Sequence, residues 1–354
     1  MDFSFYRGKT VLVTGHTGFK GAWMCRVLAL QGARVVGYAL QPPTEPSLFR
    51  LAGIGKGMIS ISGDVRDLPH LKEVFREYKP EIVIHMAAQP IVRESYANPV
   101  YTYETNVMGT VNVLEAARDA ACVRSLVNVT TDKVYRNSEW EWGYREIDPL
   151  DGYDPYSNSK SCSELVTASY YRSFFQNSQT AVSTCRAGNV IGGGDFAKDR
   201  IVPDCVRAME QGKAIQVRNP YSTRPYQHVL EPVCAYLLLA QRQYERGAEA
   251  EGSYNIGPDE CDCVMTGDLV SLFCHYWGGN AAWVNLAEEN APHEANFLKL
   301  DCSKIKKALG WSPRWHIAET MEKTVEWSKA YLAGEDVSAV MDRQIREYLG
   351  GDAV

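Results

Sequence analysis

A tyrosine and a lysine, Tyr156 and Lys160, stand four positions apart in a segment of helical character. This spacing places the phenol and the ammonium group on the same face of a helix. A neighbouring ammonium group stabilises the phenolate, which lowers the tyrosine pKa from about 10 toward the range of a general base. The same spacing occurs by chance in many helices, so the pair gains its weight from the strand that precedes it.

Three polar residues, Thr131, Asp132 and Lys133, follow directly after the predicted strand 125–130. Catalytic side chains gather at the carboxyl ends of parallel strands, so a hydroxyl, a carboxylate and an ammonium group are well placed here to face a substrate. The alternative is a polar turn in which Asp132 is a cap and Lys133 is solvated. We favour the catalytic interpretation because the helix with Tyr156 follows this strand.

A glycine-rich turn joins the first predicted strand to the first predicted helix. Glycines let the backbone approach a pyrophosphate closely and let helix pack on strand, while the free N–H groups at the helix start face the anion. The turn has the spacing GxxGxxG, which is the spacing of extended short-chain dehydrogenase/reductases. We therefore predict that a dinucleotide binds at this turn, through Gly15, Thr17, Gly18, Phe19, Lys20 and Gly21.

Further residues for the dinucleotide follow the third and fourth predicted strands. Asp64 and Val65 come after strand 58–62, where a carboxylate can accept a hydrogen bond from the adenine amino group; the alternative role for Asp64 is a helix N-cap. Small residues end the fourth strand where a flat cofactor would lie, and the predicted set here is Ala87, Ala88, Gln89 and Asn106. We predict NAD as the cofactor, but the second strand ends without an acidic residue for the ribose hydroxyls, so NADP stays open.

Alternation of short apolar runs with amphipathic segments predicts the scaffold, a doubly wound parallel sheet of the Rossmann type. We expect strands at 10–14, 34–38, 58–62, 82–86, 125–130 and 181–186, and helices at 20–30, 68–78, 100–119 and 156–175. Residues 1–186 should form the dinucleotide-binding domain, to which 226–250 return with a helix at 228–246. Residues 187–225 and 251–354 should form a smaller, mostly helical lobe that binds the substrate.

Length and composition exclude several classes of function. The 354 residues carry 37 basic and 43 acidic side chains, a net charge of -6, with no long run of one sign to attract nucleic acid or a membrane surface. No apolar run reaches about 18 residues and no leader is visible, so we predict a cytoplasmic protein. Ten cysteines are scattered, and the near pair Cys261 and Cys263 has no partner pair, so no metal is predicted.

Over nearly its whole length the chain resembles the CDP-glucose 4,6-dehydratases, a group of nucleotide-sugar dehydratases within the extended short-chain dehydrogenase/reductase family. The blocks that carry the resemblance are 15–21, 131–133, 142–146, 152–160, 186–195, 224–229, 292–295 and 300–304. The resemblance implies dehydration of CDP-D-glucose to CDP-4-keto-6-deoxy-D-glucose, a step in deoxysugar biosynthesis that serves lipopolysaccharide O-antigen. It also implies an NAD that is regenerated in each turnover.

The resemblance assigns a role to each polar residue of the predicted site. Tyr156 would take the C4 hydroxyl proton, Thr131 would hydrogen-bond that oxygen, and Lys160 would tune Tyr156 and hold the ribose. Asp132 would protonate the oxygen that leaves C6. Lys133 replaces the Glu of dTDP-glucose dehydratases, so it could be the base at C5, a partner that holds Asp132, or a cation for the enolate; we favour the base.

A nucleotide sugar is the small-molecule partner that the resemblance implies. Its diphosphate calls for arginine forks and helix N-termini, and its base calls for flat surfaces. The segments that extended family members use for these contacts contain Asn189, Arg200, Arg224 and His228. Each could instead be a surface cation or a cap. Spacing alone does not identify cytosine, which rests on the resemblance.

Two other functions stay open. A nucleotide-sugar 4-epimerase would share the fold, the cofactor, Tyr156 and Lys160, but would not need charge at both Asp132 and Lys133. A catalytically idle, dinucleotide-sensing regulator would usually have lost the Tyr–Lys pair, which is intact here. We also predict a homodimer or homotetramer, because helices 100–119 and 156–175 carry apolar residues on more than one face and family members commonly pair these helices.

Overall fold

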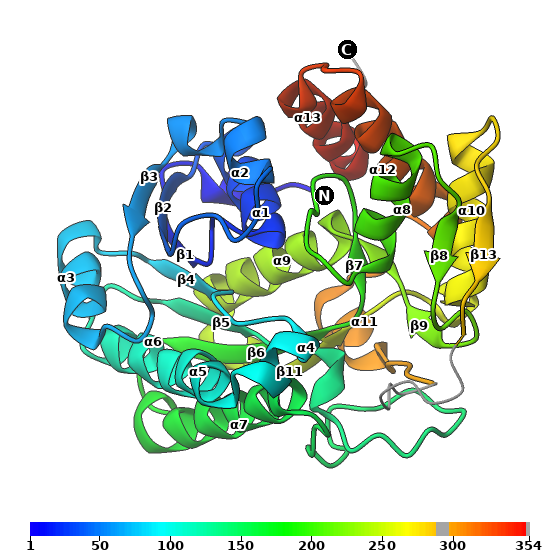
Figure 1. The fold of residues 1–354 in the computed structure, drawn as a ribbon. Coiled ribbons are helices and arrows are strands. Elements are labelled where there is room, and N and C mark those ends of the chain that lie inside the picture. The colour runs from blue at the N-terminus through cyan, green and yellow to red at the C-terminus, as the bar shows by residue number, and fades with distance from the viewer. Residues whose placement is uncertain (288–296, 352–354) are drawn as a thin grey trace.

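A computed structural model describes residues 1–287 and 297–351 of the chain. Its centre is one sheet of seven strands in the order β11-β6-β5-β4-β1-β2-β3, and all neighbouring strands run parallel (Figure 1). The strands are β1 (Thr10–Thr14), β2 (Arg34–Ala39), β3 (Ile59–Ser62), β4 (Ile82–His85), β5 (Ser125–Val129), β6 (Ala181–Ala187) and β11 (Gly252–Ile256). The predicted doubly wound sheet is confirmed.

Helices cover both faces of the sheet (Figure 1). On one face, α1 (Phe19–Leu30) and α9 (Leu230–Arg246) share an apolar core with alternate residues of the strands, such as Val127 and Val129. On the other face lie α3 (Leu68–Tyr78), α6 (Gly109–Arg118) and α7 (Pro155–Tyr170). Because side chains alternate along a strand, strands inside the sheet such as β1, β4 and β5 contribute to both layers.

The two long helices of the prediction are present, each with a widened π-helical turn. Predicted helix 100–119 consists of α5 (Pro99–Tyr103), the π-helix η3 (Glu104–Met108) and α6. Predicted helix 156–175 consists of α7 and the π-helix η5 (Tyr171–Phe175). Two short helices, α2 (Leu48–Leu51) and α4 (Val92–Ala97), lie in the connections after β2 and β4.

A second lobe stands beside the carboxyl end of the sheet and has its own apolar core, which includes Ile215, Val270, Phe273 and Met321. The elements of the lobe and of the chain that follows are α8 (Ile201–Glu210), β8 (Ile215–Val217), β13 (Trp283–Asn285), α10 (Thr266–Trp277), α11 (Ser303–Leu309), α12 (Ile317–Leu332) and α13 (Val337–Leu349). Short pairs of strands link the lobe to the sheet: β7 (Val190–Ile191) with β10 (Gln227–His228), and β9 (Thr223–Pro225) with β12 (Cys263–Met265).

The predicted division of the chain needs two corrections. Strand β11 lies within 251–354, which the prediction assigns to the lobe, but it pairs with β6 and extends the main sheet. Helix α13 also returns to the first domain, since Arg26 of α1 forms an ion pair with Asp342 at 2.5 Å. Local pattern gives no sign of either contact, because both depend on partners more than 65 residues away. Helix α9 does pack on β5 and β6, as expected for 226–250.

No helix among the described residues is long and apolar enough to cross a membrane.

Candidate active site

Helix α7 carries the predicted catalytic pair. Asp154 caps the helix by accepting a hydrogen bond from Ser157 N at 3.0 Å, and Pro155 occupies its first position. Tyr156 and Lys160 lie one turn apart on the face toward the sheet, and both are buried. Lys160 Nζ donates to the Val129 carbonyl at 3.1 Å, so the ammonium group is held at the end of β5.

Burial dominates the electrostatics of this pair. It raises the pKa of Tyr156 to about 12, although the hydrogen bond with Thr131 and the charge of Arg200 act in the opposite direction. It lowers the pKa of Lys160 to about 8, which the charge of Glu164 opposes. The expected lowering of the tyrosine pKa is therefore wrong for the protein by itself, because removal of the phenolate from water outweighs its charged neighbours.

The polar residues after β5 form a turn, as simultaneous access of Asp132 and Lys133 to one substrate requires. Asp132–Val134 is the single 3-10 turn η4, and the Thr131 hydroxyl donates to Asp132 Oδ1 at 3.0 Å. The other oxygen, Oδ2, is buried and has no hydrogen-bond partner among the described residues. A Cβ at Gly188 would lie 2.9 Å from it, so this glycine leaves room beside the carboxyl group.

Asp132 has the properties of a proton donor. The side chain is 1 % exposed. Burial raises the pKa of its carboxyl group, while Lys133, Thr131 and Arg224 act against this effect. A carboxyl group that keeps its proton more readily and has one free oxygen can deliver that proton to a leaving oxygen.

The glycine turn forms a cradle of the kind that a pyrophosphate needs. A Cβ at Gly15 would lie 2.8 Å from Ala87 N, and one at Gly21 would lie 2.2 Å from the Gly15 carbonyl oxygen, so β1, β4 and α1 meet here backbone to backbone. Gly18 stands at the N-terminus of α1 and no side chain caps it. The backbone N–H groups in the first turn of α1 are therefore open to an anion. A Cβ at Gly18 would lie 3.5 Å from its nearest neighbour, the Gly15 carbonyl oxygen, so this side of the turn has space for a dinucleotide.

The other residues predicted for the turn have distinct environments. Thr17 donates to the Leu40 carbonyl at 2.9 Å and so closes the turn against the end of β2. Phe19 begins α1 and packs against the main apolar core. Burial lowers the pKa of Lys20 to about 8, and the charges of Arg200 and Lys160 contribute. Its ammonium group donates to the Tyr236 hydroxyl at 3.4 Å.

The structure brings the residues predicted after β4 together, whereas Asp64 has an unexpected partner. Asn106 accepts from Gln89 N at 2.8 Å and donates to the Gln89 carbonyl at 3.0 Å, beside Ala87 and Ala88. Asp64 pairs with Arg66 at 2.7 Å and does not cap α3, because Asp67 does. Val65 is buried next to Asp64.

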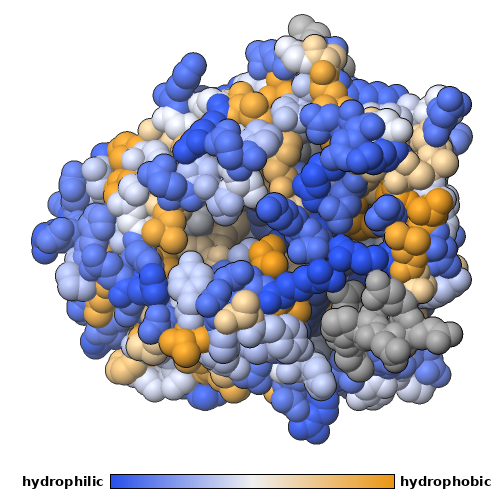
Figure 2. Space-filling model, in the orientation of Figure 1, coloured by the Kyte–Doolittle hydropathy of each residue, from blue (hydrophilic) through white to orange (hydrophobic). Residues whose placement is uncertain are grey.

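Arg200, Arg224 and Asn189 border the same site. Arg224 is buried on β9, and its charge acts on Asp132. Arg200 pairs with Asp195 at 2.9 Å, and its charge acts on Tyr156. Asn189 precedes β7 and accepts from Gln227 N through its backbone at 3.0 Å. On the face shown in Figure 2, the surface is hollowed near its centre and hydrophilic residues border the hollow.

His228 occupies a different environment from the one predicted. Its ring is fully buried between Trp23 and Trp315, with ring centroids 5.8 and 4.8 Å away. Nδ1 accepts from Leu230 N at 3.3 Å. The position is that of a core histidine, so the described geometry gives no support to a contact with substrate. The two tryptophans come from distant segments, which is why sequence reasoning did not foresee it.

Sequence reasoning also missed residues behind the site. Glu164 is buried one turn after Lys160 and pairs with the buried Arg186 at 2.8 Å. It also accepts from Thr130 and Thr184 at 2.5 and 2.6 Å. Its spacing of four from Lys160 was a usable signal.

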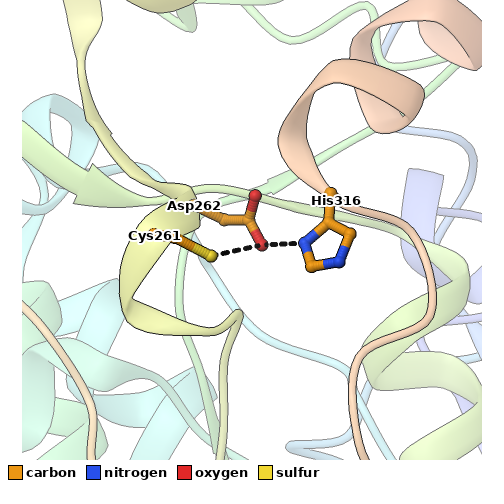
Figure 3. A group of neighbouring side chains, drawn as sticks. All are labelled: Cys261, Asp262 and His316. Carbon is orange, nitrogen blue, oxygen red and sulfur yellow. Dashed lines mark hydrogen bonds and ion pairs between the residues drawn. The ribbon is translucent and has the colours of Figure 1, made fainter.

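A cluster of possible metal ligands lies apart from this site (Figure 3). Ligand atoms of Cys261, Asp262 and His316 lie within 4.8 Å of one another, whereas the sequence suggests only Cys261 and Cys263. His316 Nδ1 lies 2.8 Å from Asp262 Oδ2, and Ile317 N donates to Oδ1 at 2.9 Å. These bonds stabilise the first turn of α12 and account for the arrangement, so we assign no metal to it.

The chain is similar in sequence to known nucleotide-sugar dehydratases. The sequence model of the GDP-mannose 4,6 dehydratase family matches residues 12–324. A CDP-glucose 4,6-dehydratase of Salmonella typhimurium (strain LT2) is 49% identical over 354 residues, which cover 99% of this chain and 98% of that protein.

Two solved structures share the fold. A UDP-glucose 4-epimerase from Stenotrophomonas maltophila with bound NAD and formylated UDP-arabinopyranose has a TM-score of 0.81, at 21% identity over 92% of this chain and 99% of that one. The UDP-glucose 4-epimerase of Thermus thermophilus in complex with NAD has a TM-score of 0.77, at 25% identity over 90% of this chain and 99% of that one.

The block 292–295 of the sequence resemblance lies outside the described residues.

Proposed function

The chain belongs to the GDP-mannose 4,6 dehydratase family, and from this premise we propose that it is an NAD-dependent hydro-lyase, a CDP-glucose 4,6-dehydratase. Its product would be CDP-4-keto-6-deoxy-D-glucose. One observation carries the choice of a dehydratase over other activities of the fold. Beside the Tyr156–Lys160 pair, the strand end holds Asp132, a buried carboxyl group with a raised pKa and a free oxygen.

The dinucleotide would lie between the glycine turn and the end of β4. The N–H groups at the start of α1 would hold its pyrophosphate, and Ala87, Ala88 and Gln89 would line its flat parts. When bound, the group would supply hydride exchange with the sugar at C4 and C6.

Tyr156 is the base at the C4 hydroxyl. Thr131, which hydrogen-bonds Tyr156 and donates to Asp132, orients that oxygen. Lys160 stabilises the phenolate and is itself fixed by the Val129 carbonyl. Oxidation at C4 acidifies the proton at C5, which prepares the elimination of water.

Asp132 and Lys133 carry out the elimination. Asp132 gives its proton to the oxygen that leaves C6, since its free Oδ2 is the oxygen with room beside Gly188. Lys133 follows it in the same turn and takes the C5 proton in our proposal. Arg200, Arg224 and Asn189 hold the diphosphate and base of the substrate. His228 is left out of the proposed contacts because its ring is fully buried.

The test of this function is the product. Purified protein is incubated with CDP-, dTDP-, UDP- and GDP-glucose, and a 4-keto-6-deoxy product is expected with CDP-glucose. Replacing Asp132 by Asn should spare oxidation at C4 and stall elimination, so that 4-keto-hexose and reduced cofactor build up on the enzyme. A 4-epimer as the product, or normal turnover by the Asp132→Asn variant, would overturn the dehydratase assignment.

We also propose that the protein is at least a homodimer that pairs its α5–α6 and α7 helices. Val100, Met108, Leu165 and Phe174 are large apolar side chains on these helices and are 70, 51, 57 and 49 % exposed. Val100 and Met108 also border an apolar groove, which is lined by Pro99, Val100, Tyr103, Glu104, Val107, Met108 and Cys162. A monomer in sedimentation at micromolar concentration would contradict this assembly, and Leu165→Asp should produce one.

A cytoplasmic location and a role in deoxysugar biosynthesis for lipopolysaccharide O-antigen complete the proposal. The similarity to the CDP-glucose 4,6-dehydratase of Salmonella typhimurium supports this role, and a nucleotide-sugar substrate supports the location. Fractionation of cells that produce the protein tests the location, and loss of a deoxysugar from the O-antigen after gene deletion tests the role.

A further inference from the structure

A histidine that the mechanism does not use, His85, lies at the end of β4 beneath the proposed cofactor site. The Thr14 hydroxyl oxygen accepts hydrogen bonds from Met86 N and Ala87 N, both at 3.1 Å. The same hydroxyl lies 2.7 Å from His85 Nδ1. Two N–H groups already point at the oxygen, so its own hydrogen is free to go to the imidazole. His85 Nδ1 is therefore an acceptor.

The second ring nitrogen then carries the hydrogen and continues the chain of bonds. His85 Nε2 lies 3.2 Å from the Thr110 hydroxyl of α6. Thr110 donates its own hydrogen to the Asn106 carbonyl at 2.7 Å, so it can accept from both His85 and Ser163 of α7, which is 3.0 Å away. Every donor in this chain meets an acceptor with only one tautomer of His85, the Nε2–H form.

A parallel set of bonds joins the same two segments. Asn106 holds the Gln89 backbone at both its N–H and its carbonyl, and its amide also donates to the Ser159 hydroxyl of α7 at 2.9 Å. Ser159 and Ser163 stand on α7 beside Lys160. The backbone at 87–89 is thus linked to the helix that carries the catalytic pair by side chains that are all buried.

We propose that His85 is a positioning residue that, as the Nε2–H tautomer, fixes the cofactor-lining backbone at 87–89 relative to helix α7. Its Nδ1 accepts a hydrogen bond from Thr14, its Nε2 donates one to Thr110, and the ring takes no part in substrate contacts. The inference rests on the proposed function, because the backbone at 87–89 lines a cofactor only if the protein binds a dinucleotide at this site. A buried histidine of this kind costs stability when unpaired, whereas both of its nitrogens are engaged here.

The tautomer can be read directly by nuclear magnetic resonance. In the protein labelled with 15N at its seven histidines, the His85 signals are assigned by their loss in His85→Asn. The expected result is an unprotonated Nδ1 and a protonated Nε2 at neutral pH. A proton on Nδ1 would overturn the hydrogen-bond chain and the proposal with it.

Two conservative variants separate the two sides of the ring. Asn at position 85 keeps an acceptor near Nδ1 for Thr14, Gln keeps a donor near Nε2 for Thr110, and Phe keeps neither. We expect His85→Phe to weaken NAD binding about tenfold and to speed amide hydrogen exchange at 86–89 and at 156–163 together. His85→Asn should retain most of the NAD affinity, and His85→Gln should recover protection mainly in α7.

The matched control is Gln243→Leu on the opposite face of the sheet. Gln243 is equally buried and also has both ends bonded, to Ser125 at 2.6 Å and Ser183 at 2.7 Å. It should lower the melting temperature yet leave NAD affinity and exchange at 86–89 unchanged. If Gln243→Leu and His85→Phe have the same effects, His85 has no special positioning role.

Failure of the proposal and failure of the proposed function give different results. The tautomer and the exchange rates need no sugar nucleotide and no turnover. A wild-type protein that is inert toward CDP-glucose but shows the expected tautomer and linked exchange would overturn only the dehydratase assignment. An active dehydratase in which His85→Phe leaves exchange and NAD affinity unchanged would overturn only the role of His85.

Discussion

Helices α7 and α9 cover opposite faces of the same strands, and each buries a glutamate in a different manner. The buried residues of α7 are polar throughout, among them Ser159, Ser163 and Thr167, and Glu164 on that helix pairs with Arg186. The buried residues of α9 are mainly apolar. Within the described part of the chain, its Glu231 accepts from two backbone N–H groups, at 3.0 and 2.8 Å, and from the Tyr348 hydroxyl at 2.6 Å.

The difference separates two ways of fixing a helix on a sheet. Apolar packing of α9 stabilises the fold, but the hydrophobic effect does not depend on the orientation of the groups in contact. The hydrogen bonds of α7 depend on orientation, so they also fix the position of that helix on the sheet. The helix that needs a defined position is α7, because it carries Tyr156 and Lys160. The following predictions test whether stability belongs to one face and catalysis to the other.

The largest expected effect is on turnover, from removal of one hydroxyl on the α7 side. Tyr156→Phe should reduce the rate by about two to four orders of magnitude, the usual contribution of a positioned base, with little change in NAD binding. The control is Tyr6→Phe, since Tyr6 is a buried tyrosine that donates to the Leu237 carbonyl of α9 at 2.6 Å. Equal losses of turnover in the two variants would refute the division of roles.

Next in size is the charge pair behind the catalytic helix. Glu164→Gln should lower the free energy of unfolding by about 3–5 kcal/mol, because Arg186 would remain buried without its partner. Urea denaturation measures the loss. The double variant Glu164→Met, Arg186→Met should recover much of it. A single variant that lost less than about 1 kcal/mol would show that the pair is not tightly coupled.

The glutamate of α9 should respond to pH instead. Burial raises the pKa of Glu231 to about 7, and the bonds from Tyr348, Trp315 and Arg314 oppose this only in part. A folded-state pKa above the unfolded value means that the folded protein binds the extra proton. The resulting stability is therefore complete below about pH 4.5 and is lost as pH rises through about 7, by up to about 3 kcal/mol.

Glu231→Gln tests that dependence. The variant should have a flatter profile of unfolding free energy between pH 5 and pH 8 and should be more stable than the wild type at pH 8. Denaturant unfolding at several pH values measures both. An unchanged profile in Glu231→Gln would assign the pH dependence to other groups.

The smallest effect is expected from a single hydroxyl on α7. Ser163→Ala removes the bonds to Thr110 and to Asn128 Nδ2, both at 3.0 Å, and should cost about 1 kcal/mol of stability. If the bonds position the helix, kcat should fall more than KM rises. Ala240→Gly on α9, with a similar cost in stability, should leave kcat unchanged.

The comparison also explains what the sequence could predict. The glycine turn, the Tyr156–Lys160 spacing and the polar residues after β5 are local patterns, and the structure brings them to one sheet edge. The apolar runs in the sequence also predicted strands of the main sheet. By contrast, the burial of His228 between Trp23 and Trp315 depends on three distant segments, and no local pattern reports it.

The polar face of α7 was the harder part for a similar reason. Its serines and threonines are buried by hydrogen-bond partners on β5, η3 and α6, and these long-range contacts leave no mark in the local sequence pattern. The pKa of Tyr156 was predicted to fall from the presence of Lys160 alone. Burial reverses the direction, and burial is a property of the whole fold.

The central claim is that the site built around α7 removes water from a CDP-hexose. The most direct test is the fate of a label in CDP-glucose that carries deuterium at C4. We expect the product to be a 4-keto-6-deoxy sugar with deuterium at C6, as read by nuclear magnetic resonance. Deuterium at C4 of the 4-epimer of the substrate, formed without loss of water, would contradict the claim and identify an epimerase.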